Sequence, residues 1–383
     1  MNKFKTFFLI FILSAIPTFF VWLPFFMRLE KFWTIPLPRE GMATIVANYD
    51  GPLYIAVAKT FYNTESLSKL PFTLPVEYYA AHFPLYPLLI RGFSYILGYP
   101  YSMLFVTFIT SILAIWFFSK YIADFVDKDE IIWMTILFSV FPARWLVVRS
   151  VGSPEPLFLF GVIGAIYFFR KEKYLLAGIM GAIATLTKSP GILLFPALFM
   201  AMMVSKFNKS AILKTSNILK SIKLSSLLPL FLIPLALIGV FYIYQTQFGS
   251  FLAYFKSGDN IHLFFPPFQI FNYSAPWVGT FWLEEVIFVY LLAAIGVYKL
   301  LEIDKVGSWF AGIFFISILF VAHRDLIRYS LPLIPFILAG FSKYLVKKEF
   351  KFAFAIIIIP IYLFSLAFIS QNVMPIPDWA PLL

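Results

Sequence analysis

Long apolar runs, separated by short stretches rich in lysine and proline, dominate this sequence. A membrane-spanning helix needs about 20 mainly apolar residues, and many of these runs approach that length. We predict eleven spans, near residues 7–27, 101–119, 131–147, 154–169, 174–188, 191–205, 226–246, 286–301, 307–322, 329–346 and 350–370. The pattern therefore predicts an all-α polytopic membrane protein, with residues 1–383 forming a single transmembrane domain.

One further apolar segment, 84–98, is short for a span and carries Arg91 near its middle. A charged side chain at bilayer depth is costly, so we predict that this segment lies in the membrane interface. It then belongs to a long outer loop, 28–100, inserted after the first span. No small-residue cleavage site follows the first apolar run, which we interpret as a retained span rather than a signal peptide.

The lysines and arginines indicate an orientation. With the N-terminus inside, each inner segment is short and basic, as the positive-inside rule requires. These segments contain Lys3 and Lys5, Lys120 and Lys128, Arg170 to Lys173, the loop 205–225, Lys299 and Lys305, and Lys343 to Lys351. We expect a cytoplasmic (plasma) membrane protein with its C-terminus outside, and the loop 205–225 lying on anionic lipid.

Composition excludes several classes of protein. The chain is 61% hydrophobic and 13% charged, too apolar for a soluble protein of 383 residues. Its net charge of +11 is spread between apolar runs, which argues against nucleic-acid binding. There is no cysteine, and His82, His262 and His323 lack metal-ligand spacing. We expect no cofactor; a divalent metal would have to bind through Asp50 and Glu155, and so few clustered ligands favour a metal-free site.

Ionisable residues gather at the predicted outer ends of the spans, where they tend to mark function. The candidates are Asp50 and Tyr54 in the outer loop; His82, Tyr86 and Arg91 around the interfacial segment; Arg149 and Glu155 between two spans; Lys188; and Arg324 with Arg328. Each also has a structural interpretation. Asp50 precedes Gly-Pro and would serve as an N-cap, and Arg91 would extend to the lipid headgroups. Glu155 would be an acidic residue in the first turn of a helix, where the helix dipole stabilises its negative charge.

Several short motifs occur in a family-like order: Asp-Gly-Pro-Leu-Tyr at 50–54, Phe-Pro-Leu-Tyr-Pro-Leu-Leu-Ile-Arg at 83–91, Ser-Pro-Glu at 153–155 and Leu-Thr-Lys at 186–188. Together they resemble the GT-C membrane glycosyltransferases, in particular the PIG-V-like family of the second mannosyltransferase of glycosylphosphatidylinositol assembly. The likeness runs from about residue 48 to 340. It departs from the family at His82 and at Gly152 to Glu155.

The resemblance implies an inverting glycosyltransferase that takes a sugar, usually mannose, from a polyprenyl- or dolichyl-phosphate donor on the outer face of the membrane. It implies that Asp50 is the catalytic base, and Glu155 is a second catalytic candidate. A departing phosphate needs no proton but does need positive charge, so Arg328, Arg324, Lys188 and Arg91 are candidate phosphate ligands. We assign sugar or acceptor binding to Tyr54, His82, Tyr86 and Arg149.

Two other functions stay open on sequence alone. A transporter or lipid flippase would need charges at the bilayer midplane and repeated halves, which we do not find. A catalytically inactive partner subunit of the same fold is the third interpretation, and Asp50 argues against it. The acceptor, whether a glycan, a glycolipid or a protein, is not indicated.

Overall fold

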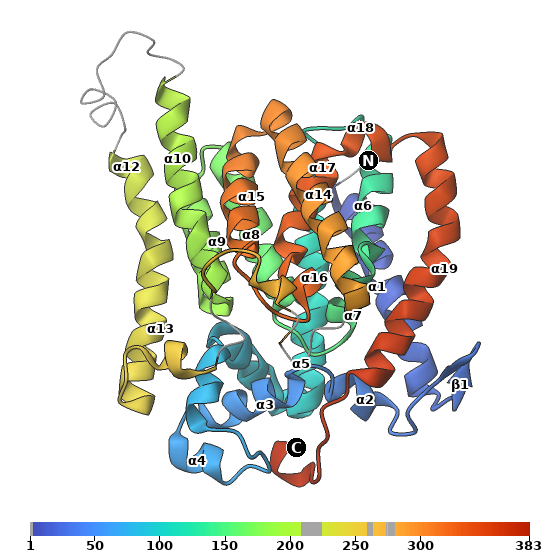
Figure 1. Cartoon of the computed structure of the whole chain (residues 1–383), viewed down its shortest axis with the longest axis vertical. Helices are drawn as coiled ribbons and strands as arrows, with labels where there is room; N and C mark the ends of the chain where they lie inside the picture. Colours follow the sequence, from blue (N-terminus) through green and yellow to red (C-terminus); the bar gives the residue numbers. More distant parts are fainter. Residues whose placement is uncertain (1–2, 208–223, 259–262, 273, 275–279) are drawn as a thin grey trace.

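The computed structural model describes residues 3–207, 224–258, 263–272, 274 and 280–383. Nearly all its elements are helices, which form an upright bundle with a layer of short helices across one end (Figure 1). The described strands are β1 (Lys31–Phe32) and β2 (Ile35–Pro36), which form an antiparallel hairpin after the first helix. The all-α polytopic architecture predicted from the hydrophobic pattern is confirmed.

Within the described part of the chain, five helical stretches are long and apolar enough to cross a membrane. They lie in α1 (Lys3–Phe26), α5 (Leu85–Ile122), the run α12 (Leu224–Leu227), η3 (Leu228–Phe231) and α13 (Leu232–Phe248), α14 (Thr280–Ile303) and α19 (Lys348–Gln371). Shorter helices occupy other predicted spans: α8 (Glu155–Arg170), α9 (Tyr174–Thr187), η2 (Ser189–Leu193) with α10 (Leu194–Phe207), and α15 (Lys305–Ile318). The number of membrane crossings stays a prediction.

Two predicted spans are not continuous helices. The span 131–147 consists of α6 (Glu130–Val140) and α7 (Ala143–Ser150), bent by 70° where Pro142 cannot continue the helical hydrogen bonds. The span 329–346 is divided into α16 (Leu326–Tyr329), η7 (Leu331–Leu333), α17 (Ile334–Gly340) and α18 (Ser342–Leu345). Pro332 and Pro335 each stand at the start of a new helical segment, a position where the missing N–H does little harm.

The segment 84–98 is joined to the following span rather than separate from it. Helix α5 runs through both, but Gly98 has φ 70° and ψ 163°, which interrupts the helix at that point. Before this break, Tyr95 and Ile96 are more than 80% exposed on the protein surface. An apolar surface of this kind fits the predicted interfacial position of the segment.

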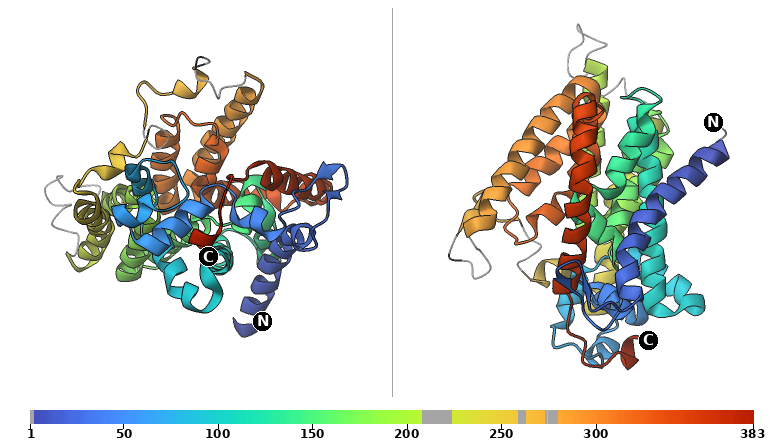
Figure 2. Two further views of the ribbon diagram at one scale, coloured as in Figure 1. Left: turned by 90° about the horizontal axis from the view of Figure 1, so that it is seen from below. Right: turned by 90° about the vertical axis from the view of Figure 1, so that its right-hand side faces the viewer.

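The layer across the end of the bundle contains α2 (Met42–Val46), α3 (Gly51–Thr60), α4 (Thr64–Ser68), η1 (Val76–Ala81), η4 (Ala253–Lys256) and η8 (Ala380–Leu382). We call it the outer layer; the right-hand view of Figure 2 places it at the lower end of the bundle. An aromatic core holds it to α13: Tyr62 and Tyr244 meet edge to face at 5.4 Å, and the Tyr244 hydroxyl donates to the Ala80 carbonyl at 2.8 Å. The short η6 (Gln269–Phe271) lies outside this layer, beside the end of α15, where the Phe268 N–H donates to the Leu319 carbonyl at 2.8 Å.

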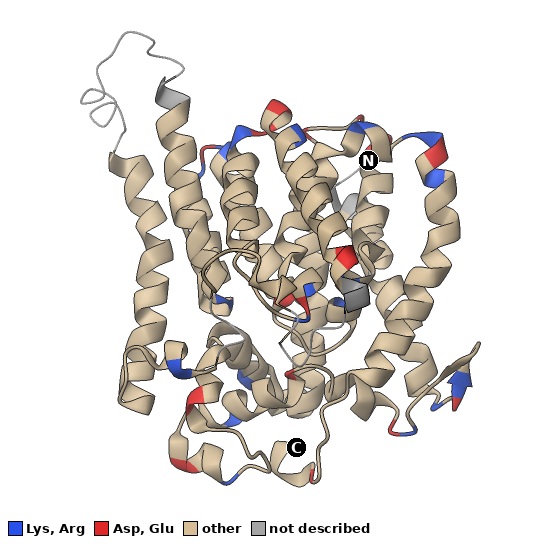
Figure 3. Cartoon of the chain, in the orientation of Figure 1, with Lys and Arg blue, Asp and Glu red and all other residues tan. Residues whose placement is uncertain are grey.

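Most of the predicted inner segments meet at the other end of the bundle (Figure 3). Ion pairs join them there: Lys171 Nζ lies 3.0 Å from Asp124, and Lys351 Nζ lies 2.6 Å from Glu130. Residues 208–223 of the basic loop 205–225 lie outside the described residues. The structure thus places the basic segments together and away from the outer layer, while the inside-outside orientation stays a prediction.

Candidate functional site

A cavity of about 1260 Å³ lies where the outer layer meets the bundle. Its walls come from parts of the chain that are far apart in sequence: the start of α3, η1, α7, η2, α13, α15, the segment before α16, and the residues after α19. Polar residues line one part of it. Leu237, Phe241, Phe314 and Val321 give another part an apolar surface.

Asp50 lines this cavity from the outer layer. It stands at the N-cap position of α3, yet its side chain makes no capping hydrogen bond, so the interpretation of Asp50 as a capping residue is wrong. The helix begins without such a cap because Pro52 lacks an N–H and favours the first turn. Among the described residues, the Asp50 carboxylate has no hydrogen-bond or ion-pair partner. A half-buried, unpaired carboxylate facing a cavity is available to a ligand.

The chain just before Asp50 is fixed by the last turn of α19 and by the segment that follows this helix. The amide of the buried Asn48 side chain donates to the Ile369 carbonyl at 2.7 Å, and the Met374 N–H donates to the Ala47 carbonyl at 2.7 Å. Asn48 and Val373 form an isolated antiparallel bridge. Local sequence gives no signal for this pairing, which joins residues more than 300 positions apart.

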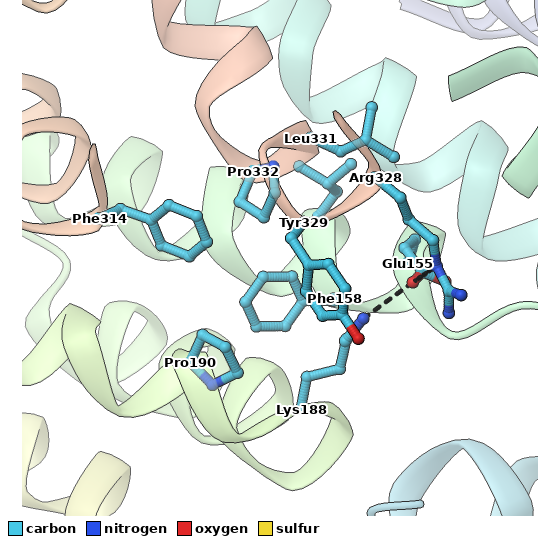
Figure 4. Close-up of a pocket in the computed structure, with 10 residues that line it drawn as sticks. Glu155, Phe158, Lys188, Pro190, Phe314, Arg328, Tyr329, Leu331 and Pro332 are labelled. Carbon is cyan, nitrogen blue, oxygen red and sulfur yellow. Dashed lines mark hydrogen bonds and ion pairs between the residues drawn. The ribbon is translucent and has the colours of Figure 1, made fainter. Parts of the chain in front are cut away.

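Glu155 gathers two cations beside the cavity (Figure 4). Its Oε1 accepts from Arg328 Nε at 2.7 Å and from Lys188 Nζ at 2.8 Å, while its Oε2 accepts from the Ser153 hydroxyl. The Glu155 side chain is only 4% exposed. Its carboxylate is therefore occupied, which suits an anchor for the two cations rather than the predicted catalytic acid or base.

Arg328 and Lys188 both line the large cavity, and the exposed Arg324 lines it as well. The hydrogen bond from Arg328 to Glu155 uses Nε, so it leaves the two terminal nitrogens of the guanidinium for other partners. Three cations that line one cavity, two of them paired with a single carboxylate, suit the binding of an anion. Asp50 and Arg328, which we expected to act together, line the same cavity.

The comparisons with known proteins concern this whole arrangement. No protein-family model and no curated protein matches the sequence. Three solved structures of the oligosaccharyltransferase from the archaeon Archaeoglobus fulgidus are similar in fold. The apo form has a TM-score of 0.53 at 12% identity, and the form with an inhibitory peptide and a dolichol-phosphate has 0.53 at 14%. The form with zinc and sulfate has 0.50 at 14%.

The matches cover 96–99% of this chain and 54–58% of the oligosaccharyltransferase, so the chain spans a little over half the length of that protein. This chain has the GT-C fold. The fold that the motif resemblance implied is thus confirmed, while identities of 12–14% carry no information on substrate.

Tyr54 and His82 also line the cavity of this GT-C fold, on the outer-layer side. Their rings meet edge to face at 4.7 Å. Burial lowers the pKa of His82 and raises that of Tyr54 well above its usual value, so both side chains are neutral at physiological pH. Neutral aromatic and imidazole groups beside a carboxylate suit the binding of a hydroxyl-bearing ligand.

Three predicted site residues are not among those that line the cavity. Arg91 is on α5 and is not among the residues that line it. The buried Tyr86 hydroxyl lies 2.6 Å from Thr107 Oγ1. Arg149 is fully buried and donates to the carbonyls of Ser14 and Ser139, inside the bundle. The positions of these three side chains give no support to the predicted roles in donor, sugar or acceptor binding.

Sequence reasoning missed two residues of the cavity wall. Arg144 pairs with Asp325 at 3.3 Å, and its guanidinium carbon lies 3.7 Å from the centre of the Phe368 ring. Tyr49 accepts a hydrogen bond from Arg144 Nη1 at 3.0 Å. Arg144 lies five residues before the predicted site residue Arg149, and Tyr49 directly precedes Asp50, so proximity in sequence was the available signal.

Among the described residues, no three histidine, aspartate or glutamate side chains are grouped as ligands for a metal ion. Asp50 and Glu155, the pair considered for a divalent metal, differ in surroundings because two cations already hold Glu155. His262 lies outside the described residues.

Proposed function

We propose that this chain is an inverting glycosyltransferase that moves a sugar from a polyprenyl- or dolichyl-phosphate donor to a hydroxyl group on the outer face of the plasma membrane. Mannose is the proposed sugar, on the resemblance of the motifs to the PIG-V-like family. The observation that carries the proposal is that the Asp50 carboxylate, which pairs with none of the described residues, lines the same cavity as Arg328 and Lys188.

In the proposed reaction, Asp50 accepts the proton of the acceptor hydroxyl while that oxygen attacks the anomeric carbon. The bond from the anomeric carbon to the phosphate oxygen breaks, and the carrier leaves as its phosphate. This leaving group needs no proton, so one carboxylate is enough, in contrast to the pair that a glycosidase uses. The configuration at the anomeric carbon inverts because attack and departure are in line.

Positive charge at the departing phosphate is the second requirement. Arg328, Lys188 and the exposed Arg324 would supply it, with Glu155 keeping the first two in place. The apolar part of the wall, which includes Leu237 and Phe241, suits the hydrocarbon chain of the carrier. One related fold was solved with a dolichol-phosphate and an inhibitory peptide, which supports a lipid-linked donor. The acceptor here would be a glycan, a glycolipid or a protein.

The test uses purified protein in lipid nanodiscs, with polyprenyl-phosphate mannose labelled in the sugar and a panel of glycan, glycolipid and peptide acceptors. We expect labelled acceptor together with one equivalent of released polyprenyl phosphate. Transfer to no acceptor would remove the catalytic proposal and leave the inactive-subunit interpretation. A parallel assay in sealed vesicles detects movement of intact donor across the bilayer, which would favour a flippase.

A further inference from the structure

Tyr49 touches two of the arginines that line the cavity, Arg144 and Arg328. Its hydroxyl accepts a hydrogen bond from Arg144 Nη1 at 3.0 Å, and the Arg328 guanidinium carbon lies 4.3 Å from the centre of its ring. The ring of Phe368 packs against it at 5.6 Å. These partners belong to α7, α16 and α19, so one side chain is held by three separate elements of the bundle.

The main chain of Tyr49 is also unusual. Its φ of 50° is in the left-handed region, which costs a residue other than glycine about 1–3 kcal/mol and persists only where surrounding contacts impose it. The Tyr49 N–H donates to the Asn372 carbonyl at 3.3 Å. Because Asp50 is the next residue, the Tyr49 backbone determines the direction in which the Asp50 carboxylate enters the cavity.

A continuous chain of contacts therefore connects the two halves of the site. Glu155 holds Arg328, Arg328 lies over Tyr49, and Tyr49 accepts from Arg144. Arg144 in turn pairs with Asp325 in the segment before α16. Tyr49 is the member of this chain that is covalently next to Asp50.

We propose that Tyr49 is a positioning residue that keeps the Asp50 carboxylate and the Arg328 guanidinium at a fixed separation. This inference rests on the proposed function, in which Asp50 accepts the acceptor proton and Arg328 contacts the donor phosphate. Tyr49 itself touches neither reacting atom. The attacking acceptor oxygen and the departing phosphate must be aligned in one step. Loss of the fixed separation therefore lowers the rate of the chemical step more than it lowers the affinity for the donor.

The kinetic test compares Tyr49→Leu, which removes the ring and the hydroxyl, with Tyr49→Phe, which keeps the ring over Arg328. We expect kcat to fall roughly 100-fold in the leucine variant, the scale of a 1 Å misplacement, with the donor KM changed less than about threefold. The phenylalanine variant should lose roughly tenfold. Tyr362→Leu is the matched control, because Tyr362 also has a hydrogen-bonded hydroxyl and an aromatic neighbour but is not among the residues that line the cavity.

A leucine variant with kcat within about threefold of the wild type would overturn the proposal, whatever its melting temperature. If this variant does not fold, the phenylalanine variant decides: a loss of kcat at an unchanged melting temperature supports the role of Tyr49, and an unchanged kcat refutes it.

A second measurement needs no turnover. The chain contains no cysteine, so Asp50→Cys carries a nitroxide spin label at a single position. We expect an immobilised spectrum that becomes mobile when Tyr49→Leu is added and does not change with Tyr362→Leu. Identical spectra with and without Tyr49→Leu would refute the positioning role. Absence of sugar transfer in the wild type would instead refute the proposed function, and the spectra would still decide the role of Tyr49.

Discussion

Replacing Glu155 with glutamine keeps its size and removes the charge that two cations share. Arg328 Nε and Lys188 Nζ lie 2.7 and 2.8 Å from the same carboxylate oxygen. At an effective dielectric constant of about 20, each attraction amounts to about 6 kcal/mol before the loss of hydration is counted. Desolvation offsets most of this, and removing one partner of a buried ion pair destabilises a protein by about 3–5 kcal/mol. We expect a loss in this range for Glu155→Gln.

The assay is equilibrium unfolding by sodium dodecyl sulfate in bicelles, followed by tryptophan fluorescence. A double-mutant cycle with Arg328→Gln should give a coupling energy of about 0.5–3 kcal/mol, because the second substitution removes one of the uncompensated cations. Glu155→Gln unfolding within about 0.5 kcal/mol of the wild type, as an ordinary surface substitution would, contradicts the anchoring role.

Three further predictions concern the cavity, the packing of the bundle and its pH dependence. Arg328→Ala should raise the donor KM and lower kcat by a combined factor of about 100–1000. Arg91→Ala, which alters a residue outside the cavity, should change neither constant. Equal effects of the two substitutions on the transfer rate would refute the assignment of Arg328 to the donor phosphate. Gly178→Ala should destabilise the bundle by about 1–3 kcal/mol, because the new Cβ would lie 2.1 Å from a carbonyl oxygen in η3. Gly239→Ala in α13 is the control, since its Cβ would meet no atom within 4 Å. Unfolding midpoints that are alike would contradict this. Burial lowers the pKa of His323 to about 4, below its unfolded value near 6.5. Protonation of this imidazole therefore favours the unfolded state, and the melting temperature should fall as the pH drops from about 6.5 to 4. The His323→Asn variant should flatten that slope, and an unaltered slope would exclude His323 as its source.

The positions of the helices were largely predictable because lipid imposes a simple rule on sequence. Apolar runs between basic loops correspond to the helices of the bundle, and only breaks within them were missed. Pro142 was visible inside the predicted span 131–147, but a proline inside a membrane helix does not fix the size of the bend. The 70° turn there depends on how α7 packs against its neighbours.

The site was predictable only in part, because a sequence reports the depth of a residue better than the direction it faces. Asp50, Lys188 and Arg328 were expected at one end of the bundle, and they do line one cavity. Arg149 was expected at the same depth, but its side chain points into the bundle, where main-chain carbonyls accept its hydrogen bonds.

Contacts between distant segments escaped prediction for a different reason. The pairing of Asn48 with the residues after α19 relies on main-chain and amide groups, which every sequence offers. Such contacts leave no trace in composition, charge or periodicity. The position of Asp50 in the cavity depends on them.

The proposed mechanism requires Asp50 as the base, and the substitution Asp50→Asn removes that function. This variant keeps the shape of the side chain and removes its ability to accept a proton. In nanodiscs with polyprenyl-phosphate mannose and a competent acceptor, we predict a loss of transfer of at least about 100-fold, the lower end of general-base catalysis, with an unchanged melting temperature and donor KM. Wild-type-like turnover by a folded Asp50→Asn protein would show that Asp50 is not the base.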